Sequence, residues 1–413
     1  MTDPDQPTVP HHVVFTDSAL AVIARVATPG PTRLGMRLRD QGDLATVEGA
    51  AGNDVLVLPE QPADGWVLDE PGPLIVCWTE EDGIRAHRTT GLGGPLGERI
   101  GTSVVPAAAD AFERVHGIFE TDVLRKKSVA VLGLGSGGSF IVRELAKAGV
   151  GRFLLLDHDR LEVGNVSRHE CGLADVGRLK ANAMRDVVHQ HHPAARVFTS
   201  GLHLNGETRR QVKDLIKYVE ADLVICATDT RESRLLINRM CLQEGLPLIL
   251  GGVYRRAYGG IVQRVIPGLT PCYQCFVQAL PEQAADNEIS SAEDAARVSY
   301  TDRAVAPQPG LSTDIVPIAL HMVKLALLEL LDGESPAFAT LGADLVAPIH
   351  QWINRRELAH AGLEPMGVSI DQQSVLRWYG VLLDQLENCA VCAAGSGVAK
   401  SEDDAYFGGP EPA

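Results

Sequence analysis

The feature that most constrains the fold is a glycine loop that lies between an apolar run and a helical pattern. The run at 129–132 has the length of a buried strand, and the pattern at 139–148 ends before Gly149, which suits a helix C-cap. The loop between them reads Gly133-Leu134-Gly135-Ser136-Gly137-Gly138. Glycines in this order, after a strand and before a helix, are typical of a loop that brings backbone N–H groups and a helix N-terminus to a phosphate. The alternative is a tight strand–helix turn without a ligand.

The segments after the loop alternate between strand and helix patterns. Such alternation predicts an α/β fold with a doubly wound, mostly parallel sheet of the Rossmann type, to which 259–265 adds an antiparallel part. The strand patterns lie at 153–156, 223–227 and 248–250, and the helix patterns at 180–191, 232–244 and 315–331.

Composition divides the rest of the chain. Residues 1–12 are acidic and Pro-rich and are expected to form a disordered lead, and 393–413 a small, polar, disordered tail. Residues 13–105 are expected to form a small α+β domain without a catalytic signature, and 106–392 carry the α/β pattern. The Gly-rich stretch 91–94, together with the helix-like segment 106–119, is interpreted as the connection between the two.

The charge balance limits the classes of partner. The chain of 413 residues has 37 Lys and Arg against 53 Asp and Glu, a net charge of −16, which disfavours nucleic acid. The apolar segment 315–331 contains His321, Lys324 and Glu329, so it is predicted to be a core helix and not a membrane span. The N-terminus lacks the pattern of a signal peptide, so the cytoplasm is the expected location.

Charged residues around the loop suggest which nucleotide it binds. Asp157 ends the next strand, where its carboxylate can accept hydrogen bonds from a ribose. Arg168 and Lys180 follow, and cations there suit attack on the α-phosphate of ATP, where negative charge develops. Asp229 follows a strand end and is placed to hold Mg²⁺. Taken singly, Arg168 is also compatible with a surface salt bridge, Lys180 with a solvated helix face and Asp229 with an N-cap.

In their order and spacing, these residues resemble the ThiF/MoeB family of adenylating enzymes, which are relatives of the ubiquitin-activating enzymes. The resemblance covers residues 128–276 and continues more weakly to Cys392. It rests on seven segments: Gly133-Leu134-Gly135-Ser136-Gly137-Gly138-Ser139, Ala148-Gly149-Val150-Gly151, Asp157-His158-Asp159, Asn165-Val166-Ser167-Arg168, Asp175-Val176-Gly177-Arg178-Leu179-Lys180, Ala227-Thr228-Asp229 and Pro271-Cys272-Tyr273-Gln274-Cys275.

The resemblance implies an ATP-dependent adenylyltransferase. A C-terminal carboxylate, usually of a ubiquitin-like or sulfur-carrier protein that ends in Gly-Gly, would attack ATP to give an acyl-adenylate and pyrophosphate. A homodimer is implied, and a conjugating enzyme or sulfurtransferase is a further partner to expect. The family often has Gln where this chain has His169, and Asn where it has Thr230. The implied nucleotide contacts are Gly133, Gly135, Ser136, Gly137, Gly138, Asp157 (ribose), Asp159, Asn165, Arg168, Lys180 and Asp229 (Mg²⁺).

The family also places an arginine upstream of the first strand, often donated across a dimer interface. Arg114 is the nearest candidate for it in this chain.

Two Cys-x-x-Cys pairs predict a metal site. Four thiolates form a closed tetrahedral set for zinc, which leaves no open position for catalysis, so the predicted role is structural. The four candidates are Cys272, Cys275, Cys389 and Cys392.

Cys171 lies near the phosphate-site cations, where a partly exposed thiol with a lowered pKa would be nucleophilic. The alternative is an unreactive thiol. The irregular segment 281–309 contains no cysteine, so no stable thioester is expected on it.

Two other functions fit part of the pattern. A NAD-dependent Rossmann oxidoreductase would use the glycine loop and Asp157, but it leaves Arg168, Lys180 and the four paired cysteines without a role. An inactive adaptor subunit that holds a ubiquitin-like protein would account for an N-terminal domain without a catalytic signature.

Overall fold

The computed structural model describes residues 10–25, 31–39, 43–81, 83–105, 112, 120–280, 310–334, 336–355 and 374–393. It divides into two compact units, Met1–Asp110 and Ala111–Ala413. The expectations for residues 1–9, Arg114, the loop 281–309 and the tail from 394 onward fall outside the described residues.

The described part of the first unit is an eight-stranded sheet with one helix. The strand order is β2-β5-β6-β7-β8-β1-β4-β3. Its two end strands belong to the continuous segment 32–39, so the sheet closes back on itself around a core that includes Val13, Phe15 and Ile75. The elements are β1 (His12–Thr16), α1 (Asp17–Arg25), β2 (Thr32–Leu34), β3 (Arg37–Arg39), β4 (Leu44–Val47), β5 (Val55–Val57), β6 (Ile75–Glu80), β7 (Gly83–Thr89) and β8 (Leu96–Val105).

The glycines at 91–94 do not belong to a connection between units, so that prediction is wrong. They form the turn between the antiparallel strands β7 and β8. Gly91 and Gly93 have φ angles of 101° and 76°, and the Gly94 N–H donates to the Gly91 carbonyl over 2.9 Å. Positive φ at both positions accounts for the glycines in physical terms, because other residues rarely adopt it.

The sheet of the second unit combines parallel and antiparallel strands. In the described residues its order is β11-β10-β9-β12-β13-β14-β15-β16, of which β11 to β13 pair in parallel and the last three strands pair antiparallel. This confirms the predicted α/β class with an antiparallel extension. The strands are β9 (Ser128–Leu132), β10 (Arg152–Leu156), β11 (Arg196–Ser200), β12 (Leu223–Cys226), β13 (Leu248–Val253), β14 (Gly259–Val265), β15 (Ile349–Ile353) and β16 (Arg377–Val381).

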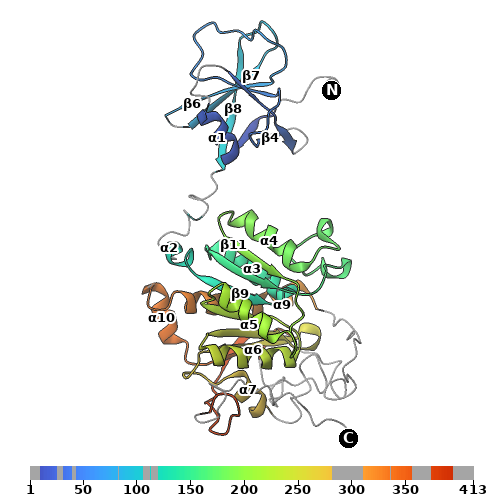
Figure 1. Ribbon diagram of the computed structural model, residues 1–413, viewed down its shortest axis with the longest axis vertical. Helices are drawn as coiled ribbons and strands as arrows, with labels where there is room; N and C mark the ends of the chain where they lie inside the picture. Colours follow the sequence, from blue (N-terminus) through green and yellow to red (C-terminus); the bar gives the residue numbers. More distant parts are fainter. Residues whose placement is uncertain are drawn as a thin grey trace. The chain divides into compact units, whose positions relative to one another are not determined.

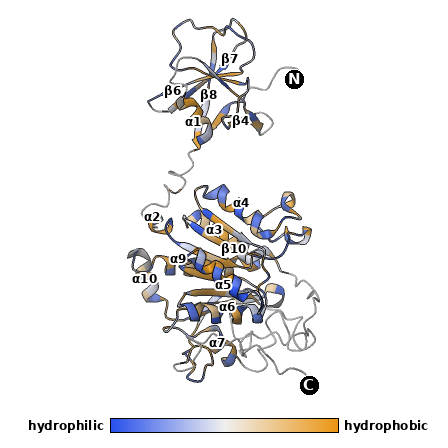
Figure 2. Cartoon of the chain, in the orientation of Figure 1, coloured by the Kyte–Doolittle hydropathy of each residue, from blue (hydrophilic) through white to orange (hydrophobic). Residues whose placement is uncertain are grey.

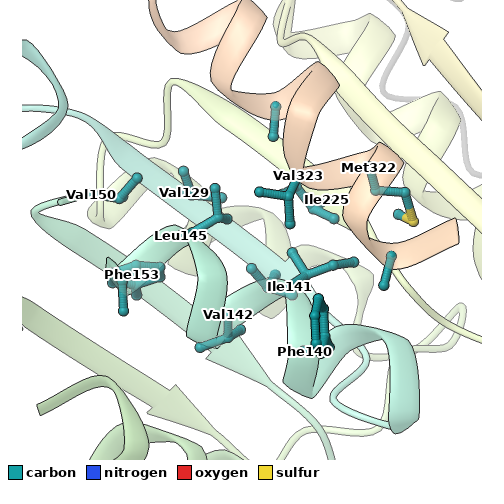
Figure 3. Close-up of a cluster of buried hydrophobic side chains, with 14 of the residues drawn as sticks. Val129, Phe140, Ile141, Val142, Leu145, Val150, Phe153, Ile225, Met322 and Val323 are labelled. Atoms are coloured by element: carbon teal, nitrogen blue, oxygen red, sulfur yellow. The ribbon is translucent and has the colours of Figure 1, made fainter. Parts of the chain in front are cut away.

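Side chains of β9 alternate between two core layers. Val129 and Val131 pack with α3, α4 and α9 on one face, whereas Ala130 and Leu132 pack with α5, α6 and α7 on the other. Figure 2 shows that the strands between these layers are mostly hydrophobic, and Figure 3 shows Ile141 and Leu145 of α3 with Met322 and Val323 of α9 in the first layer. The helices are α2 (Thr121–Leu124), α3 (Ser136–Ala148), α4 (Lys180–His191), α5 (Arg209–Tyr218), α6 (Arg231–Glu244), α7 (Tyr273–Ala279), α9 (Ser312–Leu330) and α10 (Pro336–Asp344), with short 3₁₀ turns η3 (Val163–Asn165), η4 (Leu173–Asp175) and η5 (Arg255–Ala257).

The predicted core helix at 315–331 corresponds to α9, most of whose apolar residues are buried. Among the described helices, none is long and apolar enough to cross a membrane.

Candidate active site

The candidate site lies where the chain reverses its direction across the sheet. From β9 the chain adds β10 and then β11 on one side, and it then crosses to β12 on the other side of β9. In open α/β sheets such a switch point opens a crevice at the carboxyl ends of the strands. The glycine loop follows β9, Asp157 follows β10, and Asp229 follows β12. The fold therefore brings the three sequence segments to one edge.

The four glycines of the loop divide into two pairs. A Cβ on Gly133, whose φ is +90°, would lie 2.8 Å from the Ala227 carbonyl oxygen, and a Cβ on Gly138 would lie 2.0 Å from that of Gly133. The fold itself therefore requires these two glycines. At Gly135 and Gly137, in contrast, a Cβ would meet no atom of the described residues within 4 Å. These two leave open space beside the N-terminus of α3, where a phosphate group fits.

The loop residue Leu134 is held at both of its backbone polar groups. Its N–H donates to Asp157 Oδ2 over 2.7 Å, while Asp157 Oδ1 accepts from the Asp159 N–H over 2.8 Å. Its carbonyl lies 2.9 Å from His169 Nε2, and His169 Nδ1 lies 3.0 Å from the Cys171 backbone nitrogen. Since a carbonyl can only accept and an N–H can only donate, His169 is the neutral tautomer with its proton on Nε2.

Lys180 is the first residue of α4, and its amine pairs with Asp159. Lys180 Nζ lies 2.7 Å from Asp159 Oδ2, and the Lys180 side chain is only 10% exposed. Partial burial raises the pKa of Asp159, but the hydrogen bond and positive charge of Lys180 outweigh it, so the net pKa lies below the usual value. Burial and pairing exclude the interpretation of Lys180 as a solvated helix residue.

Asn165 and Arg168 belong to the segment between β10 and α4. Asn165 Oδ1 accepts from the Glu162 N–H over 3.0 Å, which stabilises the turn η3. Arg168 is half-buried, and its side chain extends toward Gly310, which lies just before the start of α9. A Cβ added to Gly310 would lie 3.9 Å from Arg168 Nη1. The structure thus places the Arg168 guanidinium near the start of α9, while the next residue, His169, contacts the glycine loop.

Asp229 is exposed, and it does not cap the helix that follows. The N-cap of α6 is Thr230, whose Oγ1 accepts from the Ser233 N–H over 3.2 Å. The alternative interpretation of Asp229 as an N-cap is therefore wrong. Asp229 follows the carboxyl end of β12 as an exposed residue.

Sequence reasoning missed Arg234, which supports this strand end. Arg234 is buried, and its Nε and Nη2 donate to the Thr228 carbonyl over 3.1 and 3.0 Å. The contact fixes the backbone directly before Asp229. The sequence does contain a signal for this contact, because Arg234 lies among the positions of α6 that are buried. A buried guanidinium needs a hydrogen-bond acceptor such as a backbone carbonyl.

The four paired cysteines gather at one place. The Sγ–Sγ distances are 3.9 Å for Cys272–Cys275, 3.7 Å for Cys272–Cys389 and 3.3 Å for Cys275–Cys392. All four sulfurs lie within 4.8 Å of one another. A tetrahedral zinc with Zn–S bonds of about 2.3 Å has sulfurs about 3.8 Å apart, so the cluster is compatible with zinc.

The structure contradicts the properties expected of a nucleophilic Cys171. Its side chain is 3% exposed, and its Sγ lies 3.6 Å from Met184 Sδ of α4. Burial, followed by the charge of Asp175, raises the pKa of the thiol to about 12. The expectation of a partly exposed thiol with a lowered pKa is therefore wrong. The other three cysteines, Cys77, Cys226 and Cys241, are also buried in apolar clusters.

Comparison with known proteins identifies the family. The ThiF family model matches residues 110–351. Ubiquitin-like modifier-activating enzyme 5 of Caenorhabditis elegans is 29% identical over 171 residues, which are 40% of this chain and 41% of that protein. The uncharacterized protein y4oA of Sinorhizobium fredii is 31% identical over 168 residues, which are 38% of this chain and 28% of that protein. The chain thus spans less than half the length of these relatives.

Among solved structures, the crystal structure of E. coli MccB with MccA-N7isoASN aligns with a TM-score of 0.49 at 18% identity, over 66% of this chain and 69% of that one. The family match covers more than half of the chain and contains the glycine loop, Asp157, Arg168, Lys180 and Asp229. The chain belongs to the ThiF family.

Proposed function

We propose that the second unit binds ATP and adenylates a C-terminal carboxylate, with release of pyrophosphate. The observation that carries this proposal is the open space at Gly135 and Gly137 beside the N-terminus of α3, at the same sheet edge as Asp157 and Asp229. A helix N-terminus without side chains over it suits phosphate, and the cations Arg168 and Lys180 suit the charge that develops during phosphoryl attack. The family supports this chemistry.

In the proposed reaction a carboxylate oxygen attacks the α-phosphorus of ATP. The bond between that phosphorus and the oxygen that bridges it to the β-phosphorus breaks, and pyrophosphate leaves. Arg168 and Lys180 neutralise the charge on the phosphoryl oxygens, for which Lys180 must exchange part of its pairing with Asp159. Asp157 holds the loop through Leu134, and its carboxylate would also accept hydrogen bonds from the ribose. Asp229 would hold Mg²⁺, which supplies charge neutralisation for the phosphates when bound.

The proposed substrate is the C-terminus of a ubiquitin-like or sulfur-carrier protein that ends in Gly-Gly. Support comes from the relatives named ubiquitin-like modifier-activating enzyme 5. We propose that the acyl-adenylate is released or passed on without a stable thioester on 281–309, which contains no cysteine. We also propose a homodimer, which gel filtration at the monomer mass across micromolar concentrations would contradict.

The cysteine cluster is proposed to hold a structural Zn²⁺. The donor set fits, because three thiols are buried and the fourth is half-buried, and four thiolates complete a tetrahedron. A closed site of this kind stabilises the fold and takes no part in the adenylation.

The test is ATP–pyrophosphate exchange in the presence of small candidate proteins that end in Gly-Gly. Asp229→Ala or Arg168→Ala should lower exchange by roughly 10²–10³, the usual effect of one charge-stabilising contact. Asp214→Ala, on the exposed face of α5, is the matched control and should leave exchange unchanged.

Near-full exchange in the Asp229→Ala or Arg168→Ala variant would refute the assignment of these residues. ATP binding without exchange for any candidate would favour the adaptor, and binding of a nicotinamide nucleotide without ATP binding would favour the oxidoreductase.

A further inference from the structure

We propose that His169 is a positioning residue that holds the glycine loop in its nucleotide-binding form while neutral, and that protonation of its ring releases the loop. The inference rests on the proposed function, because the loop matters here as the site of the ATP phosphates. His169 itself need not touch the nucleotide, since it acts through Leu134.

The backbone of the glycine loop is held at Leu134. Leu134 separates Gly133 from Gly135, and its own side chain is fully buried, so it fixes the position of both glycines. Asp157 accepts from its N–H, and His169 donates to its carbonyl. The two contacts hold the two peptide groups on either side of the Leu134 Cα. Removing the His169 contact leaves a buried carbonyl without that donor and frees the start of α3 to shift.

The second ring nitrogen makes the contact dependent on protonation. His169 Nδ1 accepts from the Cys171 N–H over 3.0 Å, so it has no room for a proton of its own. Cys171 cannot easily move aside, because it is buried against Met184 of α4. A protonated ring would direct an N–H at the Cys171 N–H. Because Cys171 is held in place, the ring would have to turn, and this turn would take Nε2–H away from the Leu134 carbonyl.

The groups around His169 act on its titration in both directions. Burial lowers the pKa of His169, and Lys180 of α4 lowers it further. The hydrogen bond to Leu134 and the carboxylates of Asp157 and Asp175 raise it, but the net pKa lies below the usual value. His169 is therefore neutral at pH 7, and release of the loop is expected only in mildly acidic solution.

The substitution His169→Gln separates the effect of the two hydrogen bonds from the effect of protonating the ring. A glutamine side chain has one N–H₂ donor for the Leu134 carbonyl and one oxygen acceptor for the Cys171 N–H, and it does not titrate. His169→Leu removes both hydrogen bonds. The matched control is His189→Gln on α4, whose ring contacts the Ala195 carbonyl and not the glycine loop.

The experiment measures binding of a fluorescent ATP analogue to the full chain between pH 8 and pH 5, with melting temperatures for each variant. At pH 8, His169→Gln should bind the analogue as tightly as wild type. Between pH 8 and pH 5, wild type and His189→Gln should each lose about tenfold more affinity than His169→Gln. The His169→Gln curve also corrects for protonation of the nucleotide itself. His169→Leu should bind about tenfold more weakly at every pH at which it is folded.

An equal acid loss in wild type and His169→Gln would overturn the inference even if His169→Leu fails to fold. So would wild-type affinity in folded His169→Leu. Absence of ATP binding by wild type at every pH would instead refute the proposed function, and this inference with it.

Discussion

Single glycines of the loop have separate physical roles that the sequence motif does not distinguish. Gly133 and Gly138 satisfy steric demands within the chain, because an added Cβ would overlap backbone atoms. Gly135 and Gly137 meet no such demand from the described residues, and neither has a positive φ. What distinguishes them is access from outside, which is the condition for close approach of a phosphate.

This division predicts opposite effects of two Gly→Ala substitutions. Gly135→Ala should leave the melting temperature nearly unchanged and weaken ATP binding, because its Cβ occupies the open space. Gly138→Ala should cost about 1–3 kcal/mol of folding free energy through overpacking, because its Cβ would lie 2.0 Å from the Gly133 oxygen. Thermal unfolding and ATP titration of both variants provide the check. Equal loss of stability in both would contradict the division.

The sequence predicted the members of the site better than their contacts. The glycine loop, Asp157 and the Cys-x-x-Cys pairs follow from local order along the chain. The double hold on Leu134 does not, since His169 reaches it from a distant position in the sequence only after α3 and the β10–α4 segment have packed together. The exposure of Cys171 was misjudged for the same reason: its polar neighbours in sequence conceal its burial against Met184 of α4.

At the scale of elements, α9 packs against the antiparallel edge of the sheet through three aromatic rings, of which His350 is buried and His321 and Trp378 are half-buried. His321 of α9 stacks on Trp378 of β16 at a centroid distance of 4.1 Å and lies 4.6 Å from His350 of β15. Burial, followed by His350, lowers the pKa of His321 to about 4 from an ordinary 6.5. This contact between elements therefore depends on a neutral imidazole.

The lowered pKa predicts an acid-sensitive fold. The unfolded chain binds a proton at His321 near pH 6.5 and the folded chain only near pH 4, so the stability is fully present above pH 6.5 and falls as the pH drops from 6.5 to 4. The loss from this residue is at most about 3 kcal/mol. Urea unfolding at pH 7 and pH 5 should show a smaller loss for His321→Phe than for wild type. An identical loss would refute the role of His321.

The sequence predicted strands that are buried on both faces of the sheet. It did not predict β7 and β8, which lack burial on both faces. The apolar runs of β9, β10, β12 and β13 are covered by helices on both faces, so hydrophobicity alone located them. Strands β7 and β8 contain arginine, glutamate and histidine at their half-buried and exposed positions. Their pairing depends on neighbouring strands, so the glycine turn between them, at 91–94, was mistaken for part of a connection.

At the scale of the whole molecule, the cysteine cluster joins parts of the chain that are far apart in sequence. Cys272 and Cys275 lie at the start of α7, and Cys389 and Cys392 lie near the end of the described residues. Asn238 of α6 accepts from the Tyr273 N–H over 2.9 Å, which ties this end of α7 to the helix that follows Asp229. A cation at the cluster would therefore fix the C-terminal segment to the α/β core.

Loss of this cation is predicted to destabilise the fold without acting on the chemistry directly. Burial raises the pKa of the Cys272 thiol to about 12, so without a cation this thiol stays protonated, and the cluster lacks the metal–sulfur bonds that would hold its four members together. Cys275→Ser should release zinc and lower the melting temperature. Exchange activity measured well below the new melting temperature should stay close to that of wild type. Cys241→Ser, which alters a buried thiol outside the cluster, is the matched control and should keep the zinc content. Metal analysis and calorimetry decide the point: if Cys275→Ser abolishes exchange while zinc content and melting temperature remain those of wild type, the cysteines act in the reaction and not in the fold.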